Sequence, residues 1–171
     1  MRLPAIALTC VLAAAIVVQG QARDPKLEAQ LRQLFPSATG FTPKGGDPAH
    51  IKAFQGDQSN VIGYAFYTTD LQPLERAYDG PIKYLVGLDR NAKLTGIVLV
   101  EHHEPYGDFS IMTGGFQIQF KGKDIRDPFR VGGDIDAISR ATVSMTSSAR
   151  AIRNSARRIA RAFLTPPGES R

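Results

Sequence analysis

The chain has 171 residues, a formal net charge of +5 and one cysteine, Cys10. A single cysteine excludes an intramolecular disulfide framework and a multi-cysteine metal site. The length is that of one ordinary domain, which can bury a substantial core.

The N-terminus has the pattern of a secretory signal peptide. Met1 and Arg2 precede an apolar run over residues 3–18, and the small residues Gly20 and Ala22 stand before Arg23. We therefore expect residues 1–22 to be removed and residues 23–171 to form one exported domain. The run is shorter than the roughly 20 residues that a membrane span requires, and no later segment is as apolar, so we expect no membrane span. An exported protein rarely meets nucleic acid, so the positive charge suits an acidic partner, an anionic cofactor or simply a solvated surface.

The first half of the exported chain predicts a helix followed by two strands. Leucines at helical spacing lie between Asp24, a suitable N-cap, and Pro36, which stops the helix. Residues 36–49 are rich in glycine and proline and predict an irregular loop. β-Branched and aromatic residues predict strands over 50–55 and 60–70, joined by a turn at 56–59.

The second half predicts a hairpin and a long final helix. Strands over 82–89 and 94–103 are joined by the short polar loop 90–93. A short helix or turn is expected over 112–120. The last helix is expected to begin near Thr142 to Ser144, and the prolines at 166 and 167 are expected to end it. Its apolar stripe comprises Met145, Ala149, Ile152, Ala156, Ile159 and Phe163.

The order of these elements predicts the fold class. Neighbouring strands joined by short loops form antiparallel sheets, and flanking helices pack against them. We therefore expect a single α+β domain, with a mostly antiparallel sheet packed against an N-terminal helix and a long C-terminal helix.

The segment Glu101-His102-His103-Glu104-Pro105, at the end of the strongest strand, contains residue types that bind metals. Strand alternation sends Glu101 and His103 to one face and His102 and Glu104 to the other. One face then offers at most two ligands, which favours polar residues at a strand end over a metal site, although metal binding through the histidines stays open. The chain has neither a Gly-x-Ser-x-Gly nucleophile elbow nor a phosphate loop, so its sequence does not support a hydrolase or a nucleotide-binding enzyme.

A cluster of hydroxyl residues stands where the last helix is expected to start. It comprises Ser139, Thr142, Ser144, Thr146, Ser147 and Ser148. Such residues commonly cap helices. The first turn of a helix also offers free N–H groups and partial positive charge, which favour a phosphate group. The residues alone leave both interpretations open.

The pattern Asp136-x-x-Ser139-x-Ala141-Thr142-x-Ser144 resembles the flavinylation motif Asp-x-x-Ser/Thr-Gly-Ala-Thr of FMN-binding domains. Such domains occur in the C subunit of sodium-translocating NADH:quinone reductase, in the G subunit of the Rnf complex and in the periplasmic part of NosR. The segments around residues 61–71, 78–89 and 94–105 are also similar in order and character to NosR-type domains.

The resemblance implies an FMN-binding electron-transfer protein of the periplasm, rather than an enzyme with its own substrate. It implies that a flavin transferase attaches FMN to Thr142 through a phosphoester, with Asp136, Ser139, Ala141 and Ser144 shaping or presenting the attachment turn. His103 and Glu104 become candidates for contacts to the flavin ring or phosphate.

Arg140 departs from the motif, which has glycine at that position. An arginine is unfavourable there if the turn needs positive φ, but its guanidinium could also pair with the phosphate. Covalent FMN, tightly bound noncovalent FMN and a flavin-free relic therefore all remain possible.

NosR-type proteins continue into membrane helices and iron–sulfur segments, whereas this chain stops at Arg171 without further cysteine. We therefore expect it to exchange electrons by docking with an unidentified redox protein. Arg150, Arg153, Arg157 and Arg161 on the last helix would form a basic docking surface or a merely solvated face. An accessory or assembly protein for a periplasmic metalloenzyme is the alternative function.

Overall fold

The computed structural model of the protein describes residues 24–71, 73–105, 107–138 and 141–164. The predicted signal peptide, Ser139, Arg140 and the two prolines after the last helix lie outside the described residues. The elements in chain order are α1 (Pro25–Leu34), β1 (Gly40–Phe41), β2 (Ile51–Phe54), β3 (Val61–Tyr67), the 3-10 turn η1 (Thr68–Asp70), β4 (Lys83–Asp89), β5 (Leu94–Glu101), the 3-10 turn η2 (Gly107–Phe109), α2 (Gly114–Ile118) and α3 (Thr142–Phe163).

The five strands form one sheet in the order β1-β2-β3-β4-β5, and every neighbouring pair is antiparallel. This arrangement confirms the predicted α+β class. The strand predictions hold to within a few residues, but β1 lies in a segment that was expected to be an irregular loop. β1 has only two residues, which is too short to produce a strand pattern in the sequence.

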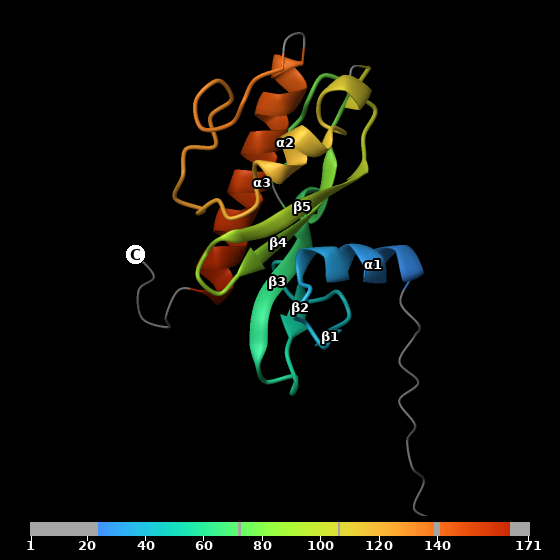
Figure 1. Ribbon diagram of the computed structural model, residues 1–171, viewed down its shortest axis with the longest axis vertical. Coiled ribbons are helices and arrows are strands. Elements are labelled where there is room, and N and C mark those ends of the chain that lie inside the picture. Colours follow the sequence, from blue (N-terminus) through green and yellow to red (C-terminus); the bar gives the residue numbers. More distant parts are fainter. Residues whose placement is uncertain (1–23, 72, 106, 139–140, 165–171) are drawn as a thin grey trace, which may run out of the picture.

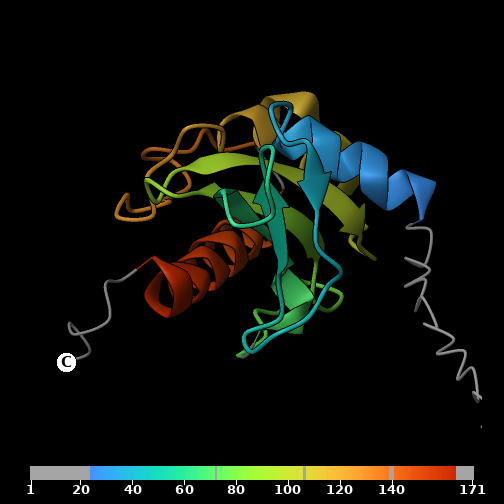
Figure 2. The same cartoon turned by 90° about the horizontal axis from the view of Figure 1, so that it is seen from below.

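The sheet separates two layers of helices, and α1 and α3 lie on opposite sides of it (Figure 1 and Figure 2). Alternation along β4 explains the two cores, because Tyr84, Val86 and Leu88 face α3 whereas Leu85 faces α1. The larger core contains the apolar stripe of α3 together with Phe116 and Phe120 from the α2 region.

The capped helix α1 packs closely against the sheet. The carboxylate of Asp24 accepts from the backbone N–H of Lys26 at 3.0 Å, as the sequence predicts for an N-cap. Glycine at position 63 makes room for Phe35, because a Cβ atom there would come within 2.5 Å of the Phe35 ring. α1 therefore packs close to the sheet and leaves the opposite face to α3.

The long helix α3 begins where the sequence predicts and buries a continuous stripe from Met145 to Ile159 against β4 and β5. Among the residues that the structure describes, no helix combines the length and apolar character needed to cross a bilayer.

Candidate functional site

The first turn of α3 presents an exposed threonine. Ala141 is the N-cap residue and Thr142 the first helical residue, and among the described residues no side-chain capping bond is made at this end. Thr142 is exposed, and Val143 beside it is 57% exposed. The N–H groups of Thr142, Val143 and Ser144 precede the first intrahelical bond, from Met145 N to Ala141 O at 3.0 Å. These N–H groups are the free donors of a helix start.

Three serines of the hydroxyl cluster do not cap the helix. Ser144, Ser147 and Ser148 are buried, and each makes a hydrogen bond to a different part of the chain. Ser144 donates to Glu104, Ser147 donates to the carbonyl of Arg76 at 3.0 Å, and Ser148 accepts from the Tyr84 hydroxyl at 2.9 Å. The capping interpretation is therefore wrong for these three serines, which dock one face of α3 onto the domain. Thr142 differs from them because its side chain is exposed.

Glu104 connects three segments at this end of the molecule. Its side chain is only 5% exposed, although it is a carboxylate. One oxygen, Oε1, accepts from Asp79 N at 2.8 Å, and the other, Oε2, accepts from Tyr78 N at 3.3 Å and from the Ser144 hydroxyl. A buried carboxylate is stable only when such donors satisfy it. Glu104 thereby ties the chain beyond β5 to the segment 75–80 and to the start of α3.

The strand alternation that was expected to divide the histidines ends at Glu101. His102 has left the sheet, and its Nδ1 accepts from Glu104 N at 3.2 Å. The His102 ring lies against Gly107, where a Cβ atom would approach it to 2.2 Å. His103 is exposed, so its contact with a flavin stays a prediction. No three metal-binding side chains of His, Cys, Asp or Glu gather among the described residues.

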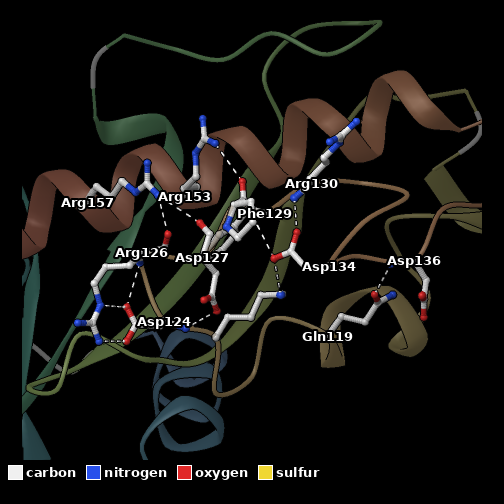
Figure 3. Close-up of polar contacts among 12 residues, drawn as sticks. Gln119, Asp124, Arg126, Asp127, Phe129, Arg130, Asp134, Asp136, Arg153 and Arg157 are labelled. Carbon is white, nitrogen blue, oxygen red and sulfur yellow. Dashed lines mark hydrogen bonds and ion pairs between the residues drawn. The ribbon is translucent and has the colours of Figure 1, made fainter.

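The loop that leads to Thr142 is fixed by a central aspartate (Figure 3). Asp134 accepts from the Lys123 ammonium at 2.7 Å and from the backbone amides of Phe129 at 3.1 Å and Arg130 at 2.5 Å. Burial alone would raise the pKa of Asp134, but these donors together lower it below the usual range. Asp136 follows, and its backbone N–H donates to the Gln119 side chain at 2.6 Å. These contacts fix the loop up to Asp136, six residues before Thr142.

Two of the four arginines predicted to form a docking surface are used inside the domain instead (Figure 3). Arg153 donates to the carbonyl of Pro128 at 3.0 Å, and Arg157 donates to the carbonyls of Ile125 at 2.6 Å and Asp127 at 3.1 Å. Their guanidinium groups hold the loop 125–128 against α3. A third, Arg150, lies 3.3 Å from Glu75 in an ion pair. The sequence could not reveal this, because the acceptors are mostly backbone carbonyls.

A groove of about 440 Å³ lies between the segment 68–75 and the second half of α3, where Glu75, Ser155 and Arg161 line it. Of the α3 residues that line the groove, Ala151 is the closest in sequence to Thr142. The two lie about 13 Å apart along the helix axis at the usual rise per residue. The groove is therefore separate from the helix start.

One large exposed aromatic side chain near the first turn of α3 was missed by sequence reasoning. Tyr78 is 75% exposed, in the segment that Glu104 and Ser147 hold against α3. The sequence signal that could have identified Tyr78 was an aromatic residue inside the turn-forming sequence Ala77-Tyr78-Asp79-Gly80. Tyr78 and Val143 both place apolar surface at the start of α3.

Residues 77–157 match the model of the FMN-binding domain family. The chain therefore carries a domain of this family, and FMN is its cofactor. A search of curated proteins gives no match. The matched segment begins beside Tyr78 and ends within α3, so it contains the whole arrangement around Glu104 and Thr142.

The residues at the start of α3 fit an FMN group. The phosphate of FMN requires N–H donors, which the first turn of α3 provides. Its flavin ring requires apolar or aromatic surface, which Tyr78 and Val143 provide beside that turn. α1 and β1–β3 lie outside the matched segment. β1–β3 form the rest of the sheet beyond β4, and α1 covers the face opposite to α3 (Figure 2).

Proposed function

We propose that this protein is an exported electron carrier whose FMN is attached to Thr142 through a phosphoester. The observation that carries the proposal is the division of the hydroxyls on α3. Ser144, Ser147 and Ser148 are buried and hydrogen-bonded, whereas Thr142 is exposed on the first turn. Among the hydroxyls of this cluster that the structure describes, Thr142 is thus the one that a modifying enzyme can reach most directly.

The attachment is a transfer from FAD by a flavin transferase. The Thr142 hydroxyl attacks the phosphorus on the flavin side of the diphosphate, the bond to the adenosine half breaks, and AMP leaves. The hydroxyl proton passes to a base of the transferase. The phosphoester keeps one negative charge, which the free N–H groups and the dipole of α3 stabilise.

Asp136, Ser139, Arg140 and Ala141 form the turn that the transferase recognises under this proposal. Ala141 is buried at the N-cap, which fits a small residue at that position. Arg140 replaces the glycine of the motif, and its guanidinium is suited to pair with the phosphate.

Electron carriage follows from the cofactor, since the flavin supplies the redox chemistry and the protein supplies its placement. A covalent link prevents FMN from dissociating from an exported protein. The redox partner would dock on the exposed side of the flavin.

The test is expression of the full chain together with a flavin transferase, followed by denaturation and mass analysis of the peptide that contains Thr142. We expect a yellow denatured protein and an FMN phosphoester on this peptide. Thr142→Ala should abolish the adduct. Thr146→Ala, a half-buried hydroxyl one turn later, is the matched control and should keep it.

Two results would contradict the covalent assignment. Colour that washes out on denaturation would leave noncovalent FMN. An adduct that persists in Thr142→Ala would move the acceptor to a neighbour. If Thr142→Ala lost the adduct but kept full function in the cell, the accessory role would replace electron transfer.

The expected export is tested separately. We propose cleavage before Arg23, on the signal-peptide pattern of residues 1–22. The mature protein should be recovered from the periplasmic fraction with Arg23 as its first residue, and retention of Met1 in a cytoplasmic pool would overturn this step.

A further inference from the structure

Tyr78 has a fixed backbone and an exposed ring. The N–H of Tyr78 donates to Glu104, and the carbonyl of Arg76, two residues earlier, accepts from Ser147. Ala77 N donates to the carbonyl of Gly80 at 2.8 Å. The ring itself is 75% exposed. Exposed apolar residues on mobile loops need no explanation. The segment that carries the Tyr78 ring is instead bonded to Glu104 and to Ser147, so its place beside α3 is defined.

One oxygen atom places the backbone of Tyr78 beside Ser144, in the first turn of α3. Oε2 of Glu104 accepts both from Tyr78 N and from the hydroxyl of Ser144. Two donors on one acceptor lie within about 6 Å of each other at ordinary hydrogen-bond distances. Ser144 belongs to the first turn of α3, so the backbone of Tyr78 lies beside that turn, on the helix face of Ser144.

We propose that Tyr78 is the side chain against which the flavin ring of FMN lies, and that Glu104 is the positioning residue that holds it there. This inference rests on the proposed attachment at Thr142 and deepens it. A flavin tethered at the first turn of α3 reaches side chains around that turn, and Tyr78 is the aromatic side chain that the structure fixes there. An offset stack of the two rings buries apolar surface on both and uses their complementary charge distributions.

The partly exposed Val143 extends the same surface from the helix side. Together Tyr78 and Val143 would cover one face of the flavin ring and leave the other face open to a redox partner. Glu104 does not need to touch the cofactor for this role, because both of its oxygens are occupied by Tyr78, Asp79 and Ser144.

The test compares the flavinylated full chain with Tyr78→Leu and Tyr78→Phe. A tyrosine in contact with a flavin quenches its emission by donating an electron, and a fixed orientation gives the flavin a visible circular dichroism signal. We expect Tyr78→Leu to raise the emission severalfold and to weaken the dichroism. Tyr78→Phe should raise the emission but keep most of the dichroism, because phenylalanine still stacks.

Tyr67→Leu is the matched control. Tyr67 packs with the core on the α1 side of the sheet, away from α3, so its loss should leave both signals unchanged. Unchanged emission and dichroism in Tyr78→Leu that carries a full FMN adduct would overturn the proposal.

Mass analysis separates this inference from the attachment itself. If a chain carries no adduct, free FMN is titrated into the wild type and into Tyr78→Leu instead. A severalfold weaker binding and less quenching in the variant support the role of Tyr78, and equal affinity with equal emission overturns it, whatever the outcome at Thr142.

Discussion

The buried hydroxyl of Ser144 donates to the buried carboxylate of Glu104, and this contact fixes the start of α3 to the chain that leaves β5. The same carboxylate accepts the backbone amides of Tyr78 and Asp79. Three segments that are distant in sequence therefore meet at one charged group. The placement of Thr142 and Tyr78 depends on it.

Removal of the Glu104 carboxylate should destabilise the domain. Glu104→Ala leaves two amides and the Ser144 hydroxyl without their acceptor, and we expect a loss of about 3 kcal/mol in the free energy of unfolding. Glu104→Gln keeps the shape and one acceptor oxygen, so its loss should be smaller. Urea denaturation measures both, with Glu101→Ala at the exposed end of β5 as the control. Equal effects at positions 101 and 104 would contradict this account.

Arg157 and Arg161 should differ in their effect on stability, although they are one turn apart. Arg157 bonds to three loop carbonyls, whereas Arg161 is exposed. Arg157→Ala should lower the free energy of unfolding by about 2 kcal/mol, since hydrogen bonds from charged groups to partly buried acceptors are lost. Arg161→Ala should change it by less than about 0.5 kcal/mol, as exposed surface substitutions do. Thermal unfolding of the two variants decides between this role and a purely solvated arginine face.

The longer helices and strands could be predicted from the sequence, but the two-residue strand β1 and the contacts between elements could not. The strands could be predicted because β-branched residues stand between turn formers, and α3 because its apolar stripe repeats at helical spacing. β4 and the apolar stripe from Met145 to Ile159 then determine which face of the sheet α3 covers.

The partners of the site residues could not be predicted in the same way. Ser147 and Ser148 look like polar residues of a helix start, and their acceptor and donor lie on distant segments. Glu104 was assigned a face by extending the strand past Glu101, where the chain in fact leaves the sheet. Alternation predicts the orientation of a side chain only inside a strand. Glu104 lies beyond the end of β5, so alternation could not predict its burial.

The acid stability of the domain should depend on Asp134. Because its donors lower its pKa in the folded state, Asp134 stabilises the fold above the unfolded pKa of about 3.9, and this contribution is lost as the pH falls through the folded pKa. Asp134→Asn should therefore be less stable at pH 7 and should lose less further stability between about pH 4 and pH 2.

Unfolding curves at a series of pH values measure this effect, with Asp108→Asn, at an exposed position, as the control. Parallel curves for the wild type and Asp134→Asn across the acid range would show that the network around Asp134 contributes nothing to acid stability.

The Tyr84 and Ser148 hydroxyls should act as one unit in the core. Both residues are fully buried, and the tyrosine donates to the serine at 2.9 Å. Burial raises the pKa of Tyr84 well above its usual range, so the hydroxyl stays protonated and remains a donor. Tyr84→Phe and Ser148→Ala should each cost about 1–2 kcal/mol, because each leaves one buried polar atom without a partner. The double variant should cost less than the sum by about 1 kcal/mol, since no orphaned hydroxyl remains. Additive losses in denaturant unfolding would mean that the two hydroxyls stabilise α3 independently, contrary to the contact that the structure places between them.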